Sequence, residues 1–232
     1  TTIPLGVIPA GTANVLAREL GLPLDARDAC RVIAERAHTR RIDAMRVGKR
    51  HYLFQVGIGI DSLMIRDTQR LQKQRFGRLA YLWTACTRLL GFQPRRFLIE
   101  TDGKRRKRRA SQVVVANGGV FGMPPYVWGP NIRLDDQRLD VCVVHARTLF
   151  DYLGLFWDLF LGRTHANRNM RYYHAEHSIL IATRKHLPVQ ADGELIGHTP
   201  IRVVLVPQAV TLIVRAPREA DFLERVGAFF DF

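Results

Sequence analysis

The sequence predicts an α+β protein of two domains, in which a short α/β segment is followed by a larger β-sandwich. Two patterns support this fold class. The first forty residues combine one short apolar run with two stretches of helical periodicity. Most of the remaining chain consists of short apolar or alternating runs separated by turn residues, which is typical of a sandwich. With 47% hydrophobic residues among 232, the chain has enough apolar side chains for a core, which excludes a disordered or collagen-like protein.

The chain is strongly basic. Its 35 Lys and Arg residues against 21 Asp and Glu residues leave a formal net charge of +14. Such an excess attracts polyanions, namely nucleic acid, an anionic membrane surface or a phosphorylated substrate. Charge alone does not choose among these three.

Targeting signals and cysteines give a further expectation. No run of about 18 apolar residues occurs, and residues 1–4 lack the basic and apolar parts of a secretory signal. We therefore expect neither a membrane-spanning nor an exported protein.

Cys30, Cys86 and Cys142 form no CxxC pair and lack the spacing of metal ligands. We interpret them as reduced core thiols in the cytoplasm.

The first forty residues predict a strand, a turn and two helices. Residues 5–8 form a short apolar run, residues 9–11 interrupt it, and helical spacing follows over residues 12–20. Asp25 is a suitable N-cap for a second helix over residues 26–37. Because a parallel strand normally needs sheet neighbours, we expect a further N-terminal part of this domain.

From residue 39 onwards the pattern alternates, which predicts a hairpin with strands over residues 42–47 and 52–56. Helices are predicted over residues 60–74 and 76–91. An apolar helix over residues 148–162 has a length that favours burial in the core. The other predicted strands cover residues 95–102, 111–117, 139–146, 171–183, 187–191, 201–206 and 210–215.

The first motif with chemical potential lies at the turn between the predicted strand and helix. Gly11 and Thr12 stand where free backbone N–H groups and the helix dipole favour an anion such as a phosphate. An ordinary turn, in which Thr12 caps the helix, explains the same spacing.

The second motif lies near the C-terminal end. Asp192-Gly193 predicts a hairpin turn, and Glu194 follows it directly. A glutamate held at the edge of a rigid sheet is well placed to take a proton from an alcohol as general base. A solvated turn carboxylate is the alternative interpretation.

Together, these segments resemble the diacylglycerol kinase catalytic family in its bacterial lipid kinase branch. Residues 5–18, with residues 21–23 after them, resemble the second signature of that family. Residues 54–61 resemble its Phe-Leu-Asn-x-x-Gly-x-Gly-x-Asp strand, residues 115–118 its central strand, and residues 192–194 its catalytic turn. These matches cover essentially the whole chain in the right order.

The resemblance implies an α/β nucleotide-binding domain followed by a β-sandwich domain, with ATP in the cleft between them. Residues 1–40 would be the C-terminal part of the first domain, residues 41–216 the sandwich, and residues 217–232 a helix that returns to the first domain. Because the family's Gly-Gly-Asp-Gly-Thr signature is absent from these residues, the resemblance also implies an N-terminally truncated kinase whose activity as it stands is in question.

The implied function is an ATP-dependent lipid kinase that transfers the γ-phosphate to the hydroxyl of diacylglycerol or a related lipid. Glu194 would be the general base. The implied ATP-contacting residues are Gly11, Thr12 and Asn14. Val15 stands where many members have aspartate. Sphingosine kinases are likewise apolar at this position, so a sphingosine or ceramide kinase-like activity is an alternative.

The resemblance also implies a structural Mg²⁺ at residues 134–140, which match the family's Leu-Asp-Asp-Gly-x-Leu-Asp segment. Asp136 would supply its carboxylate, and Arg133 and Arg138 their backbone carbonyls, which are the hard oxygen ligands that Mg²⁺ prefers. Gln137 stands where glycine is usual, which weakens the site if this position needs a positive φ. An acidic surface turn is the alternative.

Six consecutive cations, Lys104 to Arg109, follow Asp102-Gly103 and are predicted to form the tip of a hairpin. They suit an anionic membrane surface, at about 1 kcal/mol per basic residue close to it. Nucleic acid is not expected, because no nucleic-acid-binding module accompanies the run; a solvated loop is a further alternative. We thus expect a cytoplasmic protein, peripheral to the inner membrane surface, and leave open a homodimer and a non-catalytic membrane-binding fragment.

Overall fold

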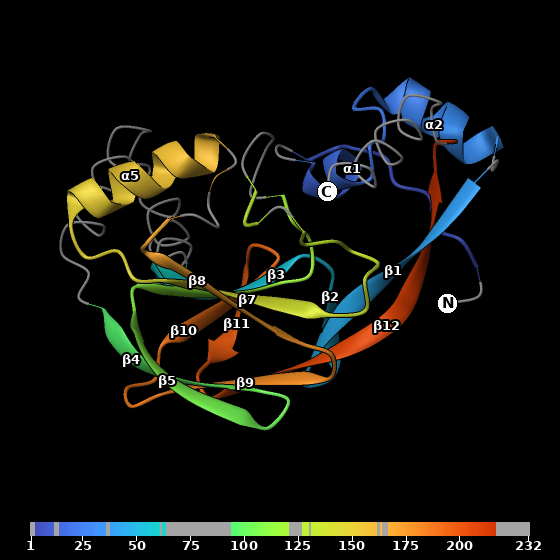
Figure 1. The fold of residues 1–232 in the computed structure, drawn as a ribbon. Coiled ribbons are helices and arrows are strands. Elements are labelled where there is room, and N and C mark those ends of the chain that lie inside the picture. Colours follow the sequence, from blue (N-terminus) through green and yellow to red (C-terminus); the bar gives the residue numbers. More distant parts are fainter. Residues whose placement is uncertain are drawn as a thin grey trace, which may run out of the picture. The chain divides into compact units, whose positions relative to one another are not determined.

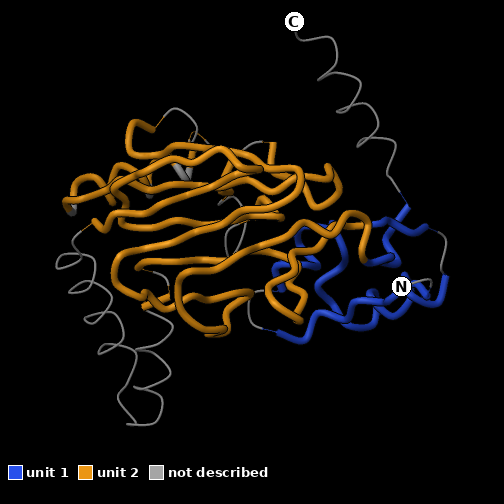
Figure 2. The backbone as a smooth tube through the Cα atoms, turned by 90° about the horizontal axis from the view of Figure 1, so that it is seen from below, with its two compact units in different colours: residues 1–41, 210–232 blue, residues 42–209 orange. Residues whose placement is uncertain are grey.

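The computed structural model describes residues 3–11, 14–35, 38–60, 62–63, 94–120, 127–129, 131–161, 163 and 167–216. The chain divides into two compact units (Figure 2), one comprising residues 1–41 and 210–232 and the other residues 42–209. The predicted helices over residues 76–91 and 217–232 lie outside the described residues, as do Cys86 and the predicted helix of residues 60–74 beyond residue 63.

Within its described residues, the first unit contains the helices α1 (Val15–Glu19) and α2 (Ala26–Glu35). Asp25 caps α2 as predicted, because its Oδ1 accepts hydrogen bonds from the N–H groups of Arg27 and Asp28 at 2.9 and 3.2 Å. Asn14, and not Thr12, is the N-cap of α1, which therefore begins later than predicted.

The strand predicted over residues 5–8 is wrong except at Leu5. This residue forms a single parallel bridge with Leu212. Its N–H donates to the carbonyl of Thr211, and its carbonyl accepts from the N–H of Ile213, both at 2.9 Å. The neighbouring residues find no ladder partner among the described residues, so the apolar run alone does not make a strand.

The strands form two six-stranded sheets (Figure 1), which confirms the predicted sandwich. The first sheet has the order β2 (Arg50–Tyr52), β1 (His38–Val47), β12 (Ile201–Val214), β9 (Ser178–Thr183), β4 (Arg95–Thr101) and β5 (Lys104–Ala110). The second sheet has the order β11 (Glu194–His198), β10 (Pro188–Ala191), β3 (Gln55–Gly59), β6 (Gln112–Ala116), β7 (Leu139–Val144) and β8 (Met170–Ala175). Every pairing within the second sheet is antiparallel.

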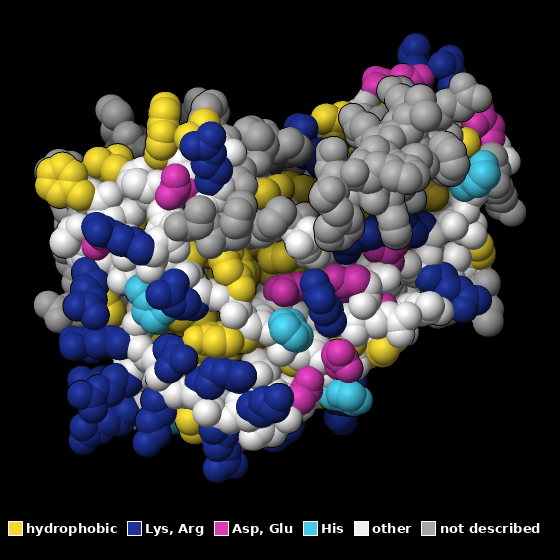
Figure 3. Space-filling view, in the orientation of Figure 1, with side chains coloured by type: hydrophobic (Ala, Val, Ile, Leu, Met, Phe, Trp, Pro, Cys, Tyr) yellow, Lys and Arg dark blue, Asp and Glu magenta, His cyan; other side chains and the backbone are white. Residues whose placement is uncertain are grey.

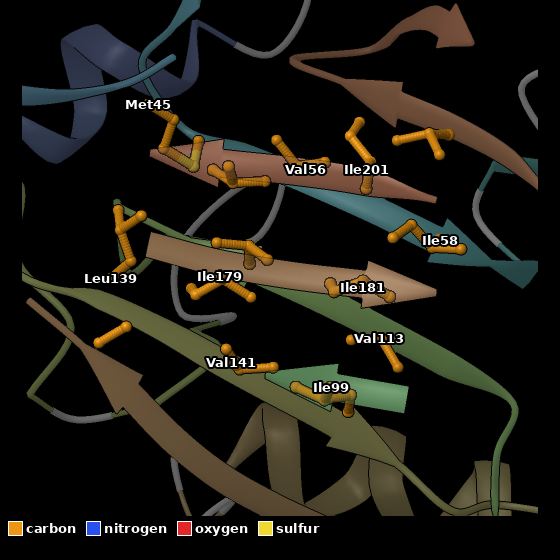
Figure 4. Close-up of a cluster of buried hydrophobic side chains, with 14 of the residues drawn as sticks. Met45, Val56, Ile58, Ile99, Val113, Leu139, Val141, Ile179, Ile181 and Ile201 are labelled. Carbon is orange, nitrogen blue, oxygen red and sulfur yellow. The ribbon is translucent and has the colours of Figure 1, made fainter. Parts of the chain in front are cut away.

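The core lies between the two sheets, where alternate residues of each strand point inward (Figure 4). The inward side chains include Val56, Ile58, Ile99, Val113, Val115, Val141, Ile179 and Ile181. The intervening residues of β6 and β7 are buried as well, because the helix α5 (Leu149–Phe160) packs on the outer face of the second sheet. Burial on both faces explains why residues 113–116 are a continuous apolar run.

Three strand predictions need correction. The predicted hairpin of residues 42–47 and 52–56 changes sheets, since β2 ends at Tyr52 in the first sheet and β3 begins at Gln55 in the second. The strand predicted over residues 171–183 is two strands, β8 and β9. The two strands predicted between residues 201 and 215 are one, β12.

The two described cysteines differ from each other. Cys142 is fully buried, as predicted, and burial raises the pKa of its thiol. Cys30 is exposed on α2, so the prediction of a core thiol is wrong at this position.

Candidate active site

Glu194 lies directly after a tight hairpin turn at the edge of the second sheet. The two-residue loop Asp192-Gly193 joins β10 to β11, and Ala191 pairs with Glu194 across it. Both loop residues have positive φ, 45° and 89°, as a type I′ turn requires. Glu194 is exposed, and no hydrogen bond or ion pair engages its carboxylate within the part of the chain that the structure describes. The carboxylate is therefore available to accept a proton.

Asp192 connects this turn to a neighbouring segment, because its carboxylate accepts three backbone hydrogen bonds. Oδ2 accepts from the N–H of Leu53 at 2.7 Å, and Oδ1 accepts from Phe54 at 3.0 Å and Gln55 at 2.9 Å. These N–H groups belong to the corner where the chain passes from β2 to β3. Hydrogen bonds to a charged acceptor are stronger than neutral ones, so Asp192 fixes both this corner and the position of Glu194.

Buried Gln190 completes the support of the turn. Its side chain is 1% exposed, and its Oε1 accepts a hydrogen bond from the N–H of Gly193 at 3.0 Å. The register of β10 and β11 shifts between Val189 and Gln190, which forms a bulge next to the turn. Bulges of this kind often re-aim side chains beside functional sites.

The predicted metal loop, residues 134–140, is held by buried Asp43. Oδ2 of Asp43 accepts a 2.7 Å hydrogen bond from the N–H of Gln137, and Oδ1 accepts one of the same length from the N–H of Gln208. Gln137 has a φ of 58°, so this position does adopt the left-handed conformation for which glycine is better suited. The sequence gives no sign of this role of Asp43, because one acid between Ile42 and Ala44 matches ordinary alternation of buried and exposed residues in a strand.

The carboxylates of the loop are desolvated. Burial raises the pKa of Asp136, with smaller contributions from the charges of Asp43 and Asp135, although Arg138 opposes the shift through a backbone hydrogen bond and its charge. Burial is also the main cause that raises the pKa of Asp140 to about 6. Oδ2 of Asp140 is buried without a hydrogen-bond partner among the described residues.

These features fit a bound cation in part. Buried, hard carboxylate oxygens favour Mg²⁺, and a cation near Asp136 and Asp140 would offset their desolvation. However, the Nε of Arg138 already lies 3.4 Å from Oδ2 of Asp136. The described residues contain no cluster of three or more His, Cys, Asp or Glu that could hold a metal ion.

Asn117 connects the metal loop to the Glu194 turn. It is fully buried, and its Nδ2 donates to the carbonyls of Asp43 at 3.0 Å and Leu53 at 2.7 Å. Its backbone N–H donates to the carbonyl of Phe54 at 2.8 Å. The following residue, Gly118, lies so close to the Phe54 ring that an added Cβ would be 2.8 Å from it. Hydrogen bonds thus link Gln137 to Asp192 through Asp43, Asn117 and Leu53.

The predicted phosphate turn lies in the first unit. Thr12 lies outside the described residues. The N–H of Gly11 donates to Oδ1 of Asn14 at 2.8 Å, and Asn14 itself has a left-handed φ of 48°. The amide of Gly11 is therefore already hydrogen-bonded within the turn, so the geometry alone does not present it to a phosphate.

The cationic segment Lys104 to Arg109 is strand β5, and the prediction that it forms a hairpin tip is wrong. The tip is Asp102-Gly103, and the cations alternate between the two faces of the edge strand. Arg106 and Arg108 turn inward onto the ring of Tyr173, at 4.8 and 5.6 Å from its centroid.

Arg105, Lys107 and Arg109 lie on the opposite face of β5 from Arg106 and Arg108. Nε of Arg105 lies 2.6 Å from Oε2 of Glu100. A groove of about 520 Å³ on the outer face of β4, β5 and β9 includes five cations in its lining, Arg96, Lys107, Arg108, Arg109 and Arg184. Figure 3 shows Lys and Arg side chains gathered at the left and lower side of the molecule, where β4 and β5 lie.

The two-sheet sandwich, with the Asp192-Gly193-Glu194 turn at the edge of its second sheet, places the chain in a known class of β-sandwich domains. The chain belongs to the family described as the YegS C-terminal NAD kinase beta sandwich-like domain, whose model matches residues 54–214. The model of the diacylglycerol kinase catalytic domain matches residues 1–47. The family resemblance inferred from the sequence is thereby confirmed.

Individual relatives agree with this family. A Staphylococcus epidermidis protein named "Putative lipid kinase SERP0390" is 26% identical over 220 residues, which cover 91% of this chain and 68% of that protein. The uncharacterized protein sll0036 of Synechocystis is 28% identical over 220 residues. The match covers 91% of this chain but only 49% of the Synechocystis protein, so the chain spans about half the length of that relative.

A solved structure described as a "putative diacylglycerol kinase" from Bacillus anthracis is similar to the fold. Its TM-score is 0.72 at 27% sequence identity, and the alignment covers 91% of this chain and 68% of that structure. A second Bacillus anthracis structure with a TM-score of 0.64 shares 22% identity and supports the fold alone.

Proposed function

We propose that this chain is part of an ATP-dependent lipid kinase that phosphorylates the hydroxyl of diacylglycerol or a related lipid. The observation that carries the proposal is Glu194, an exposed carboxylate without a hydrogen bond or ion pair to the described residues, on a turn that Asp192 fixes through three backbone hydrogen bonds. Membership of the family and the names of its relatives agree with this activity.

In the proposed reaction, Glu194 takes the proton of the lipid hydroxyl while the hydroxyl oxygen forms a bond to the γ-phosphorus. The bond between that phosphorus and the β,γ-bridging oxygen breaks, and ADP leaves with the electron pair. A general base contributes about 10² to 10⁴ to such a rate. Because Asp192 and Gln190 hold the turn, Glu194 needs little reorganisation to act.

We propose that ATP phosphates lie near Gly11, Thr12 and Asn14, by the family resemblance. Mg²⁺ would neutralise phosphate charge during the transfer. A second, structural Mg²⁺ would use the carboxylate of Asp136 and the backbone carbonyls of Arg133 and Arg138. The desolvated carboxylates support this assignment. The ion pair between Arg138 and Asp136 and the left-handed conformation of the non-glycine residue Gln137 oppose it.

Thermal unfolding with Mg²⁺ alone tests the structural site. Millimolar Mg²⁺ is expected to raise the melting temperature of the wild type and to leave Asp136→Asn unchanged. An equal Mg²⁺ effect on both proteins would exclude Asp136 as a ligand. Asp28→Asn, which changes an exposed acid on α2, is the matched control.

An anionic membrane surface is the proposed partner, since the lipid substrate lies in a bilayer. No helix in the described ranges is long and apolar enough to cross a bilayer. The outward cations Arg96, Lys107 and Arg109 support electrostatic attraction to such a surface. The expected effect is a faster encounter at low ionic strength.

Substrate profiling tests the activity directly. The full-length protein is incubated with ATP, Mg²⁺ and mixed micelles of diacylglycerol, monoacylglycerol and sphingosine, and phosphorylated lipids are read by mass spectrometry. Phosphatidic acid as the main product would support the diacylglycerol assignment, whereas sphingosine phosphate would favour the sphingosine kinase-like alternative. The absence of every product would contradict the proposal and favour a non-catalytic membrane-binding role.

A further inference from the structure

Helix α5 exposes an apolar face, contrary to the expectation of a buried core helix. Phe150 is 83% exposed, Leu153 55%, Trp157 61% and Leu161 42%. Their spacing of three, four and four residues places all of them on one side of the helix. Figure 3 shows hydrophobic side chains gathered over α5 at the upper left of the molecule. Exposed apolar patches on a folded domain mark interaction surfaces.

The opposite side of α5 is anchored to the sandwich. Tyr152 and Leu155 pack against a buried cluster on the outer face of the second sheet that includes Val114 and Cys142. The hydroxyl of Tyr152 donates to the carbonyl of Ala146 at 3.3 Å. The exposed face is thus not the result of a loose helix, because the helix is packed on its other side.

The two acidic residues of α5, Asp151 and Asp158, lie on neither the exposed apolar face nor the packed face. Both accept side-chain hydrogen bonds. Oδ2 of Asp158 accepts a 2.6 Å hydrogen bond from Nδ2 of Asn167, and Oδ1 of Asp151 accepts a 3.1 Å hydrogen bond from Nδ2 of Asn169. Asp151 also accepts from the N–H groups of Arg147 and Thr148 at the start of the helix. The apolar face therefore carries no negative charge that would repel an anionic surface.

Exposed cations flank both ends of this face. Arg147 precedes α5, and Arg163 follows it. In an antiparallel pairing with a second copy of the chain, these cations would face each other as like charges. An anionic lipid bilayer offers complementary charge at both ends and an apolar region between them. An apolar face with Trp, Phe and Leu and with basic flanks is typical of a helix that lies in a bilayer interface.

We propose that α5 is the lipid-inserting element of this protein, lying in the plane of an anionic bilayer. Phe150, Leu153 and Trp157 would enter the boundary between headgroups and acyl chains, and Arg147 and Arg163 would contact headgroup phosphates. The inference goes beyond the proposed kinase activity and needs no ATP. It also distinguishes two surfaces, since α5 covers the outer face of the second sheet while the groove beside β5 lies on the outer face of the first. A flat bilayer contacts only one of these faces at a time.

Co-sedimentation of the full-length protein with vesicles, without ATP, tests the proposal. The vesicles contain either phosphatidylcholine alone or a mixture of phosphatidylcholine and phosphatidylglycerol, whose anionic headgroups attract basic residues. Phe150→Gln combined with Trp157→Gln is expected to reduce binding at least tenfold, while the control Leu24→Gln, at a 42% exposed leucine of the first unit, leaves it unchanged. Undiminished binding of the double variant would overturn the proposal, provided that its melting temperature matches the wild type.

Two further measurements separate lipid insertion from its alternatives. Brominated phosphatidylcholine is expected to quench tryptophan fluorescence in the wild type and to do so less in Trp157→Phe, which keeps an apolar side chain and its vesicle binding. If Arg96→Gln combined with Arg109→Gln abolishes binding and the α5 variants do not, the groove is the bilayer contact. If the α5 double variant instead dissociates a dimer without vesicles, the face belongs to a second copy. Either of these last two results would overturn the proposal.

Discussion

The backbone N–H of Gln137 donates a 2.7 Å hydrogen bond to Oδ2 of Asp43, a residue 94 positions earlier in the chain. Asp43 is fully buried, and its own N–H donates to the carbonyl of Leu134 at 2.6 Å. These two bonds hold residues 134–140 against β1. Asp43 thus fixes the conformation of the loop that is proposed to bind Mg²⁺.

Gln137→Gly is expected to stabilise the protein by about 1 kcal/mol, because a non-glycine residue is strained at a φ of 58°. Urea unfolding measures the change. Gly103→Ala is the matched control, since Gly103 has a φ of 82° and open space around its Cβ position, and it should lose about as much stability as Gln137→Gly gains. No gain from Gln137→Gly would argue against the left-handed loop.

Asp43→Ala is expected to cost about 3 kcal/mol of unfolding free energy. The change removes the acceptor of the N–H groups of Gln137 and Gln208 and leaves both donors without their partner. Asp28→Ala, at an exposed acid on α2, should change stability by only about 0.5 kcal/mol. A small effect of Asp43→Ala in urea unfolding would contradict this role. It would show that water reaches the N–H groups of Gln137 and Gln208 and replaces the carboxylate as their acceptor.

Asp192→Asn is expected to loosen the corner between β2 and β3. Asparagine has one carbonyl oxygen and no charge, so at least one of the three hydrogen bonds from residues 53–55 is lost. We expect a loss of about 1 to 2 kcal/mol and faster amide hydrogen exchange at Leu53, Phe54 and Gln55. Unchanged exchange at these amides would contradict the role of Asp192 as the support of the turn.

The lowered pKa of Asp102 is expected to make the stability of the protein depend on pH. Burial tends to raise the pKa of its carboxyl, but hydrogen bonds from the N–H groups of Ser178, Glu176 and His177 outweigh this and lower it below 3.8. Since the folded-state pKa lies below the unfolded one, the stabilisation is complete above pH of about 4 and is lost as the pH falls through the folded value. Asp102→Asn should flatten the stability curve in this acidic range. Parallel curves for wild type and variant in urea unfolding would refute the assignment.

Sequence patterns predicted the sandwich because the inward residues of β4, β6, β7 and β9 alternate with outward ones or lie in apolar runs. They did not predict β5, because six consecutive cations carry no apolar alternation; its strand conformation comes from backbone pairing with β4 along its whole length. The motif Asp-Gly-Glu located the candidate base in the sequence. The supports of that turn were not predictable, since Asp192 reaches residues 137 to 139 positions away.

Asp102 and Asp192 each have a second structural role that the Asp-Gly turn motif does not indicate. Both were recognised only as the first residue of an Asp-Gly turn, and both adopt positive φ, 47° and 45°. In the structure each carboxylate also accepts three consecutive backbone N–H groups of a distant turn. Only the fold brings those partners together, so local sequence carries no sign of the second role.

The most direct test of the central claim is the turnover of Glu194→Gln in the full-length protein, with ATP, Mg²⁺ and lipid micelles. Glu176→Gln is the matched control, because Glu176 is also an exposed glutamate at a tight turn, the one that joins β8 to β9. The account predicts that Glu194→Gln lowers kcat by about 10² to 10⁴ with little change in KM, while Glu176→Gln keeps the wild-type rate and both variants keep the wild-type melting temperature. A Glu194→Gln protein that phosphorylates lipid at the wild-type rate would contradict the assignment of Glu194 as the general base.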